Sequence, residues 1–273
     1  MIEIPEAALL ARQVTQTLGG KVVQSAAAGQ SPHKFAWFSG SSDDYARALT
    51  GRAIEDAVPR GGMLEVHAGD AWLLFQDGVN LRYHADPADR PDRHQLLLEF
   101  SDGSALSASV AMYGGLYCFP AGQFDNPYYQ AAREKPSPLG ADFTLDYFLG
   151  LFQPALDRLS AKAFLATGQR IPGLGNGVLQ DILYHARVNP KRKMGTLDAA
   201  ARERLYEAVV TTLHEMTAAG GRDTERDLFG RPGGYATKMS KNTVGQPCPE
   251  CGSLIVKEAY MGGSVYYCPG CQA

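Results

Sequence analysis

Four of the chain's five cysteines lie in its last twenty-six residues. They form two Cys-x-x-Cys pairs, Cys248/Cys251 and Cys268/Cys271, separated by sixteen residues. A tight turn of this kind presents two thiolates to one cation, and two such turns are typical of a structural Zn²⁺ site. Two disulfides or four free thiols are the alternatives, and the metal-type spacing favours zinc. A metal ion bound by four thiolates has no free coordination position, so it should stabilise the local fold and should not activate water.

The residues between the two cysteine pairs favour a β-hairpin. Leu254 to Val256 and Val265 to Tyr267 are β-formers, and Met261 to Ser264 supplies a glycine-rich turn. Such a hairpin is too small for a core of its own, so metal binding should drive its folding.

A second candidate site is the stretch Arg170–Gly177, which is rich in glycine and lies between two expected helices. Its backbone can turn tightly and leave amide groups uncovered at the positive end of the next helix, as in a phosphate site. Gly175 and Asn176 lie in this bend, and Lys162 on the preceding helix could add a charge. An ordinary helix–helix turn is the alternative. The position between helices argues against a dinucleotide-binding loop.

The N-terminal tip is the third candidate. Pro5 suits the first turn of a helix and Glu6 suits the positive end of its dipole. Glu3 then lies just ahead of that helix, on a terminus that could enter a cleft.

The chain around these sites divides into an α+β arrangement. Short strand-like runs fill residues 21–120, with hairpin turns expected at Asp77-Gly78 and Asp102-Gly103, and favour a β-sandwich or barrel. Helices are expected afterwards at 143–159, interrupted by Gly150 and Pro154, and at 162–166, 178–186 and 197–219. We therefore predict an N-terminal β-sandwich domain over 1–125 with a leading helix, a linker over 126–141, a helical domain over 142–245 and a zinc finger over 246–273.

Charge is distributed unevenly along the chain. The net charge of −3 combines 11 basic and 18 acidic residues in 1–150 with 15 basic and 11 acidic residues in 151–273. A polyanionic partner would bind mainly the C-terminal half, although surface variation explains the charge equally well. The absence of a long apolar run and of a leader, together with the thiolate site, predicts a cytoplasmic protein, and we expect a monomer. Cys118 is expected to be a buried apolar residue.

Three motifs together resemble one known family. They are Pro172-Gly-Leu-Gly-Asn176 followed by Asn189-Pro190, the four-cysteine hairpin, and the opening Met-Ile-Glu3-Ile-Pro5-Glu6. In this order they are similar to the formamidopyrimidine-DNA glycosylase / endonuclease VIII family over the whole chain. The resemblance implies a helix–two-turn–helix motif and DNA bound between two domains, with damaged bases flipped into a pocket. It implies catalytic roles for Glu3, Glu6 and the residue at position 2, and DNA contacts by Lys162, Gly175, Asn176, Tyr235 and Lys238.

The chain departs from the family pattern at positions that matter for chemistry. Ile2 replaces the proline whose amine attacks the sugar, and initiator methionine is usually retained before so large a side chain. Met63 stands where the family has a phosphate-contacting lysine, and Gly263 where its hairpin has an arginine. The loop that fills the gap left by a flipped base aligns with 111–114 and lacks its arginine. Each lost charge-assisted contact removes about 1.5–3 kcal/mol.

Three hypotheses follow. The first is a base-excision-repair glycosylase with altered chemistry, with or without a lyase step, in which water or a primary terminal amine replaces proline. The second is an inactive protein that binds DNA or abasic sites, with Lys191 to Lys193, Lys238, Lys241 and Lys257 as replacement phosphate contacts or merely solvated surface. The third is an interaction or small-molecule role for polar and aromatic clusters at 31–38 and 77–84, which more often form a half-buried hairpin face.

Overall fold

The first helix, α1 (Ile4–Leu18), begins directly behind the N-terminal tip in the computed structural model, which describes residues 1–273. Glu3 caps it in an extended conformation, and the Glu6 carboxylate accepts a hydrogen bond from the Glu3 amide at 3.3 Å. One face of α1, including Ala7, Val14 and Leu18, is fully buried. Apolar residues at helical spacing thus fix this helix against a core, as predicted.

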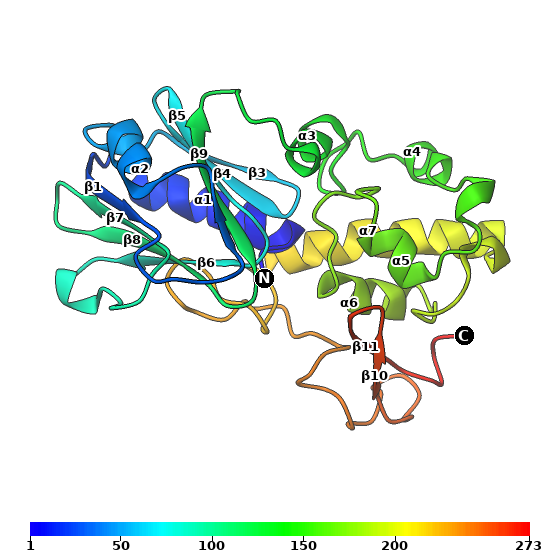
Figure 1. Cartoon of the computed structure of the whole chain (residues 1–273). Coiled ribbons are helices and arrows are strands. Elements are labelled where there is room, and N and C mark those ends of the chain that lie inside the picture. Colours follow the sequence, from blue (N-terminus) through cyan, green and yellow to red (C-terminus); the bar gives the residue numbers. More distant parts are fainter.

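Two sheets form the N-terminal domain (Figure 1). One is antiparallel with the order β1-β7-β8-β6, and the other has the order β2-β9-β5-β4-β3, in which β2 runs parallel to β9. The strands are β1 Val23–Ala28, β2 Ala36–Phe38, β3 Ala57–Arg60, β4 Met63–Ala68, β5 Ala71–Phe75, β6 Val79–His84, β7 Leu96–Phe100, β8 Ala105–Val110 and β9 Gly114–Pro120. Their inward side chains and α1 share one apolar core, which confirms the sandwich.

The domain differs from the prediction in two places. Helix α2 (Ser42–Leu49), capped by the Ser41 hydroxyl, interrupts the expected run of strands. Asp102-Gly103 joins the β7–β8 hairpin as predicted, but the hairpin predicted at Asp77-Gly78 is wrong, because β5 and β6 belong to different sheets. A turn motif alone does not distinguish a hairpin from a crossing between sheets.

Helices form the C-terminal domain: α4 Leu145–Gly150, α5 Ala161–Ala166, α6 Val178–His185 and α7 Ala199–Ala218, with short 3₁₀ turns at Pro154–Leu156 and Met194–Thr196. A further 3₁₀ turn, Pro87–Asp89, lies between β6 and β7 of the N-terminal domain. The expected break at Gly150 and Pro154 is present. These helices enclose a second core, which also includes Ile4 from the N-terminal tip. No helix here combines the length and apolarity needed to cross a bilayer.

The predicted linker contains a helix, α3 (Pro127–Glu134). Tyr129 of this helix is fully buried, donates its hydroxyl to the buried Glu65 carboxylate and packs edge-on against Phe119. The sequence suggested a linker because of its prolines, but Pro127 occupies the first helical turn, where proline is tolerated.

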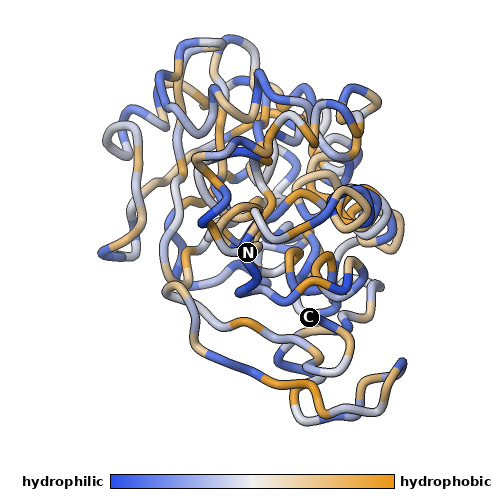
Figure 2. Tube along the Cα trace, turned by 90° about the vertical axis from the view of Figure 1, so that its right-hand side faces the viewer, coloured by the Kyte–Doolittle hydropathy of each residue, from blue (hydrophilic) through white to orange (hydrophobic).

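The last element is the hairpin of β10 (Val256–Tyr260) and β11 (Gly263–Tyr267), which confirms the prediction. It projects below the helical domain, close to α6, and the N-terminus lies where the two domains meet (Figure 1). In the turned view of Figure 2 the N-terminus is again near the middle of the molecule and the C-terminus lies beside the lower loops.

Candidate nucleic-acid interface

A cleft of about 480 Å³ lies where the N-terminal tip, the glycine-rich bend and the hairpin turn meet. Its walls come mainly from residues 1–3, from 173–176 and from 261–263, and Lys162 and Asp77 are among the other residues that line it. Segments far apart in the sequence therefore form one concave surface, and each of the three sites predicted from the sequence contributes to it.

The bend contacts the N-terminal domain through its main chain, without an intervening side chain. Gly173 has a φ of +83°, and a Cβ there would lie 2.0 Å from the Gly62 amide nitrogen. Its carbonyl accepts a hydrogen bond from the Ile4 amide at 3.2 Å. The two domains therefore meet at a point where a side chain would separate them.

Glu3 fastens the N-terminal tip to the start of α6. Its two carboxylate oxygens accept hydrogen bonds from the Gly177 and Val178 amides at 2.8 and 2.7 Å. A Cβ on Gly175 would lie 2.7 Å from this carboxyl group, so glycine is required there. Burial raises the pKa of Glu3, although Arg222 and the two amides act against that rise. The carboxylate thus satisfies a helix N-terminus.

Arg222 completes a buried cluster of three charges. It is 2% exposed and donates to both carboxylate oxygens of Glu6, at 2.9 and 2.8 Å, while a third guanidinium nitrogen lies 3.6 Å from Glu3. Burial disfavours charge on Glu6, but the guanidinium outweighs it and lowers the pKa of Glu6. Sequence inspection missed Arg222, because it follows Gly220-Gly221, beyond the last predicted helix (197–219), where the sequence suggests no regular element.

The first two residues lie at the edge of this cluster. The Met1 terminal ammonium pairs with Glu225 and is partly exposed at the cleft. Ile2 is 4% exposed, packs in the N-terminal core, and donates its amide to the Asp77 carbonyl at 2.6 Å. Burial raises the pKa of the Asp77 carboxyl group.

Asn176 and Lys162 join the bend to the hairpin. Asn176 donates its side-chain amide to the Ser264 carbonyl at 3.1 Å. The Lys162 ammonium donates to the Tyr260 carbonyl at 2.7 Å, and burial lowers the pKa of Lys162. Both side chains also line the cleft, so they hold its shape as well as offering donors to a ligand.

The other residues predicted to contact DNA lie outside the cleft. Tyr235 is 9% exposed and packs in the C-terminal core. Lys238 is exposed, and its backbone amide donates to Asp181 at 2.8 Å. Lys191 pairs with Glu258 on the hairpin. Neither Tyr235 nor Lys238 lines the cleft.

The four hairpin cysteines have their sulfur atoms within 4.8 Å of one another. Cys248 and Cys271 are 3.7 Å apart at sulfur, and Cys251 and Cys268 are 3.3 Å apart. A tetrahedral thiolate site with metal–sulfur bonds of about 2.3 Å places its sulfurs about 3.8 Å apart, so the set fits one metal ion. The Tyr184 hydroxyl of α6 lies 3.3 Å from the Cys248 sulfur and links the site to the helix beside the bend.

A β-sandwich, a helix–two-turn–helix domain and a four-cysteine hairpin around one cleft define a DNA-glycosylase type of architecture. Residues 1–114 match the family model of the formamidopyrimidine-DNA glycosylase N-terminal domain. Among curated proteins, the formamidopyrimidine-DNA glycosylases of Novosphingobium aromaticivorans and Lactobacillus delbrueckii are 29% and 28% identical over the whole of this chain and 100% and 99% of theirs.

Solved structures agree on the fold. The MutM (Fpg) protein of Thermus thermophilus superposes with a TM-score of 0.82 at 24% identity, covering 99% of this chain and 98% of that one. The Lactococcus lactis Fpg in complex with DNA containing an abasic site gives 0.81 at 22% identity, covering 99% of each chain. The match over residues 1–114 and the full-length similarity to these curated glycosylases support the formamidopyrimidine-DNA glycosylase / endonuclease VIII family.

Proposed function

We propose that this protein binds damaged or abasic duplex DNA in the cleft, as a monomer, in a base-excision-repair role with altered chemistry. The observation that carries the proposal is that the tip with Glu3, the bend with Asn176 and the hairpin turn line one cavity. The relatives support it: the Lactococcus lactis protein was solved with abasic-site DNA and with DNA carrying a benzylated formamidopyrimidine.

The metal in this proposal is one Zn²⁺ held by Cys248, Cys251, Cys268 and Cys271. Four thiolates leave no open coordination position, so the ion supplies shape and no catalytic water. Its effect on DNA passes through the hairpin, which receives hydrogen bonds from Asn176 and Lys162.

The proposed nucleophile is the primary amine at the chain terminus. Met1 lines the cleft, and its terminal ammonium pairs with Glu225 beside it. Once deprotonated, a primary amine condenses with the aldehyde carbon of an abasic sugar, with loss of water, to form an imine. If Met1 is removed in the cell, Ile2 supplies the amine instead. An intact-mass measurement of the native protein identifies which amine is present.

Borohydride trapping on abasic DNA tests this chemistry. We expect a covalent adduct, because borohydride reduces an imine to a stable secondary amine, and peptide mapping should locate it at the terminal residue. Lys162→Met is the control, since Lys162 carries the other amine that lines the cleft, and it should leave the adduct in place. An adduct mapped to Lys162, or none at all, contradicts the terminal-amine mechanism.

An inactive DNA-binding protein is the second candidate, and one observation favours it. Both oxygens of Glu3 already accept amide hydrogen bonds, and the Met1 ammonium pairs with Glu225. Groups held this way are poorly placed to move protons during base release. Under this alternative, abasic DNA binds but neither an adduct nor base release from a panel of lesions is detected.

Introducing an arginine at Gly263 should strengthen DNA binding. A Cβ there meets nothing closer than the Lys162 ammonium at 3.4 Å, and the residue lines the cleft. One new charge-assisted phosphate contact should tighten duplex binding about tenfold or more and steepen its salt dependence by about one unit. Fluorescence anisotropy across a salt series measures both.

Leu254→Arg is the matched control. It adds the same charge to the hairpin module at a side chain that is 58% exposed and lies outside the cleft. If Gly263→Arg and Leu254→Arg change affinity equally, the cleft is not where the phosphates bind.

A further inference from the structure

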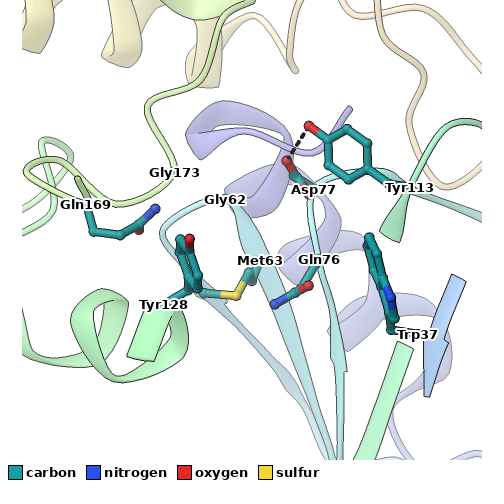
Figure 3. Close-up of a pocket in the computed structure, with 9 residues that line it drawn as sticks. All are labelled: Trp37, Gly62, Met63, Gln76, Asp77, Tyr113, Tyr128, Gln169 and Gly173. Atoms are coloured by element: carbon teal, nitrogen blue, oxygen red, sulfur yellow. Dashed lines mark hydrogen bonds between the residues drawn. The ribbon is translucent and has the colours of Figure 1, made fainter. Parts of the chain in front are cut away.

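A second cavity, of about 490 Å³, adjoins the cleft on the side of the N-terminal domain (Figure 3). The two share part of their walls, including Gly62, Asp77 and Tyr113. Its remaining walls come from β2, β4 and α3, through Trp37, Met63 and Tyr128, from Gln76 just after β5, and from the bend that precedes α6. None of these four side chains has a part in the function proposed above.

Three exposed aromatic side chains line this space. Trp37, Tyr113 and Tyr128 are 46%, 38% and 55% exposed, and none of them packs against another aromatic ring. In Figure 3 Trp37 and Tyr128 stand on opposite sides of the space, with Gln76 between them. Aromatic surface gathered in a concave wall is typical of a binding site for a planar group.

The polar groups of the cavity fit a neutral heterocycle. Gln76 and Gln169 carry carboxamides, Asp77 carries a carboxyl group, and no lysine or arginine lines the space. A phosphate would meet no positive charge here. Carboxamides and a carboxyl group instead match the mixed donors and acceptors along the edge of a nucleobase.

The cavities beside Glu6 are too small for such a group. The two that Glu6 lines, next to Arg222 and next to Ile2, have volumes of about 10 Å³ each. The buried ion cluster fills the region behind the N-terminal tip. A base that leaves a strand in the cleft therefore finds room between Trp37 and Tyr128, away from Glu6.

We propose that Trp37 and Tyr128 form a stacking site for an unpaired nucleobase of a DNA strand whose backbone lies in the cleft, with Gln76 and Asp77 contacting the base edge. This inference rests on the proposed function for the strand. A paired base has both faces covered by its neighbours, so the site favours unpaired DNA. Stacking on aromatic rings also stabilises binding without phosphate contacts. This matters in this cavity because its wall includes Met63, which stands where the family has a phosphate-contacting lysine.

The two tryptophans of the chain permit a direct test. Trp72→Phe removes the other indole, which stacks on His67 at 4.4 Å, and leaves Trp37 as the only tryptophan reporter. In the zinc-loaded full chain, a thymidine oligomer of about 8 nucleotides, within the usual site size, should quench Trp37 emission. An oligomer of equal length made only of abasic residues has the same charge and no bases, and should leave the emission unchanged.

Binding variants test the second wall. Trp37→Ala and Tyr128→Ala should each weaken binding of the thymidine oligomer about tenfold or more, and Tyr128→Phe should restore it, because a phenyl ring still stacks. Phe229→Ala is the matched control. Phe229 is an aromatic side chain of comparable exposure, 41%, and lines neither cavity.

The outcomes separate this inference from the proposed function. If duplex DNA binds with a steep salt dependence but Trp37 emission never responds, the stacking site is wrong and the proposed function stands. If the thymidine oligomer quenches Trp37 while duplex and abasic DNA do not bind, the stacking site stands and the proposed function fails. Equal weakening by Trp37→Ala and Phe229→Ala also overturns the stacking site.

Discussion

Replacing Arg222 with methionine should destabilise the protein by about 3–5 kcal/mol, the usual cost of leaving a buried carboxylate without its partner. Arg222 is 2% exposed, and its guanidinium faces the carboxyl groups of Glu3 and Glu6, two residues that are 3% and 4% exposed. Methionine fills similar volume but leaves two negative charges side by side in the interior. For a chain of this size the loss corresponds to a fall in Tm of about 10 °C, which calorimetry measures.

A nearby arginine provides the control. Arg226 is exposed and donates to the Gly230 carbonyl, so Arg226→Met should change stability by less than about 0.5 kcal/mol. The double variant Arg222→Met with Glu6→Gln should regain part of the loss, because one of the two uncompensated charges is gone. Equal Tm values for Arg222→Met and Arg226→Met would show that the cluster does not hold the domains together.

The cluster also explains the position of the N-terminal tip. Ile2 packs in the sandwich core and Ile4 in the helical core, so the tip spans both domains. Glu3 and Glu6 fasten it to Gly177, Val178 and Arg222 of the C-terminal half. The loss of Arg222 should therefore loosen the cleft before it unfolds either core, and DNA affinity should fall together with stability.

Local patterns in the sequence were sufficient for part of this site. The cysteine spacing predicts the hairpin, because both pairs and the intervening strands lie within one short stretch. The glycine-rich bend is equally local, since Gly173 and Gly175 are needed where backbone or Glu3 comes within 3 Å. Chemical demands that neighbouring residues satisfy together are visible in a single sequence.

The parts that sequence inspection missed depend on distant partners. Arg222 lies 216 residues from Glu6 along the chain, and no spacing rule relates them. Tyr128 belongs to a segment predicted to be a linker, and nothing in the sequence pointed to it. It lines one cavity with Trp37 and Asp77, which come from the two clusters that the sequence offered as a pocket lining. Only the packing of α3 beside the sheet places Tyr128 across this cavity from Trp37, so tertiary contacts decide where these aromatic side chains lie.

Removing the proposed Zn²⁺, by chelation or by Cys268→Ser, should unfold the hairpin module. Four cysteines surround the site, and its apolar support is only a small cluster with Tyr184 and Met239. The hydrogen bonds from Asn176 and Lys162 and the ion pair with Lys191 join the hairpin to the helical domain but give it no core. Structural zinc sites contribute on the order of 10 kcal/mol to the folding of such small modules. Amide hydrogen exchange over 256–267 should therefore accelerate by orders of magnitude. Helical circular dichroism should change little, because the core around α6 and α7 contains no hairpin residue.

Cys118 provides the matched control, since it is the only cysteine outside the site. Cys118→Ser should leave the zinc content and exchange rates unchanged, whereas Cys268→Ser should abolish stoichiometric zinc. DNA affinity should fall steeply with Cys268→Ser, because Asn176 and Lys162 lose the Ser264 and Tyr260 carbonyls that orient them at the cleft. If DNA binding survives metal loss undiminished, the hairpin is not part of the interface, and the bend and the N-terminal tip must bind the strand by themselves.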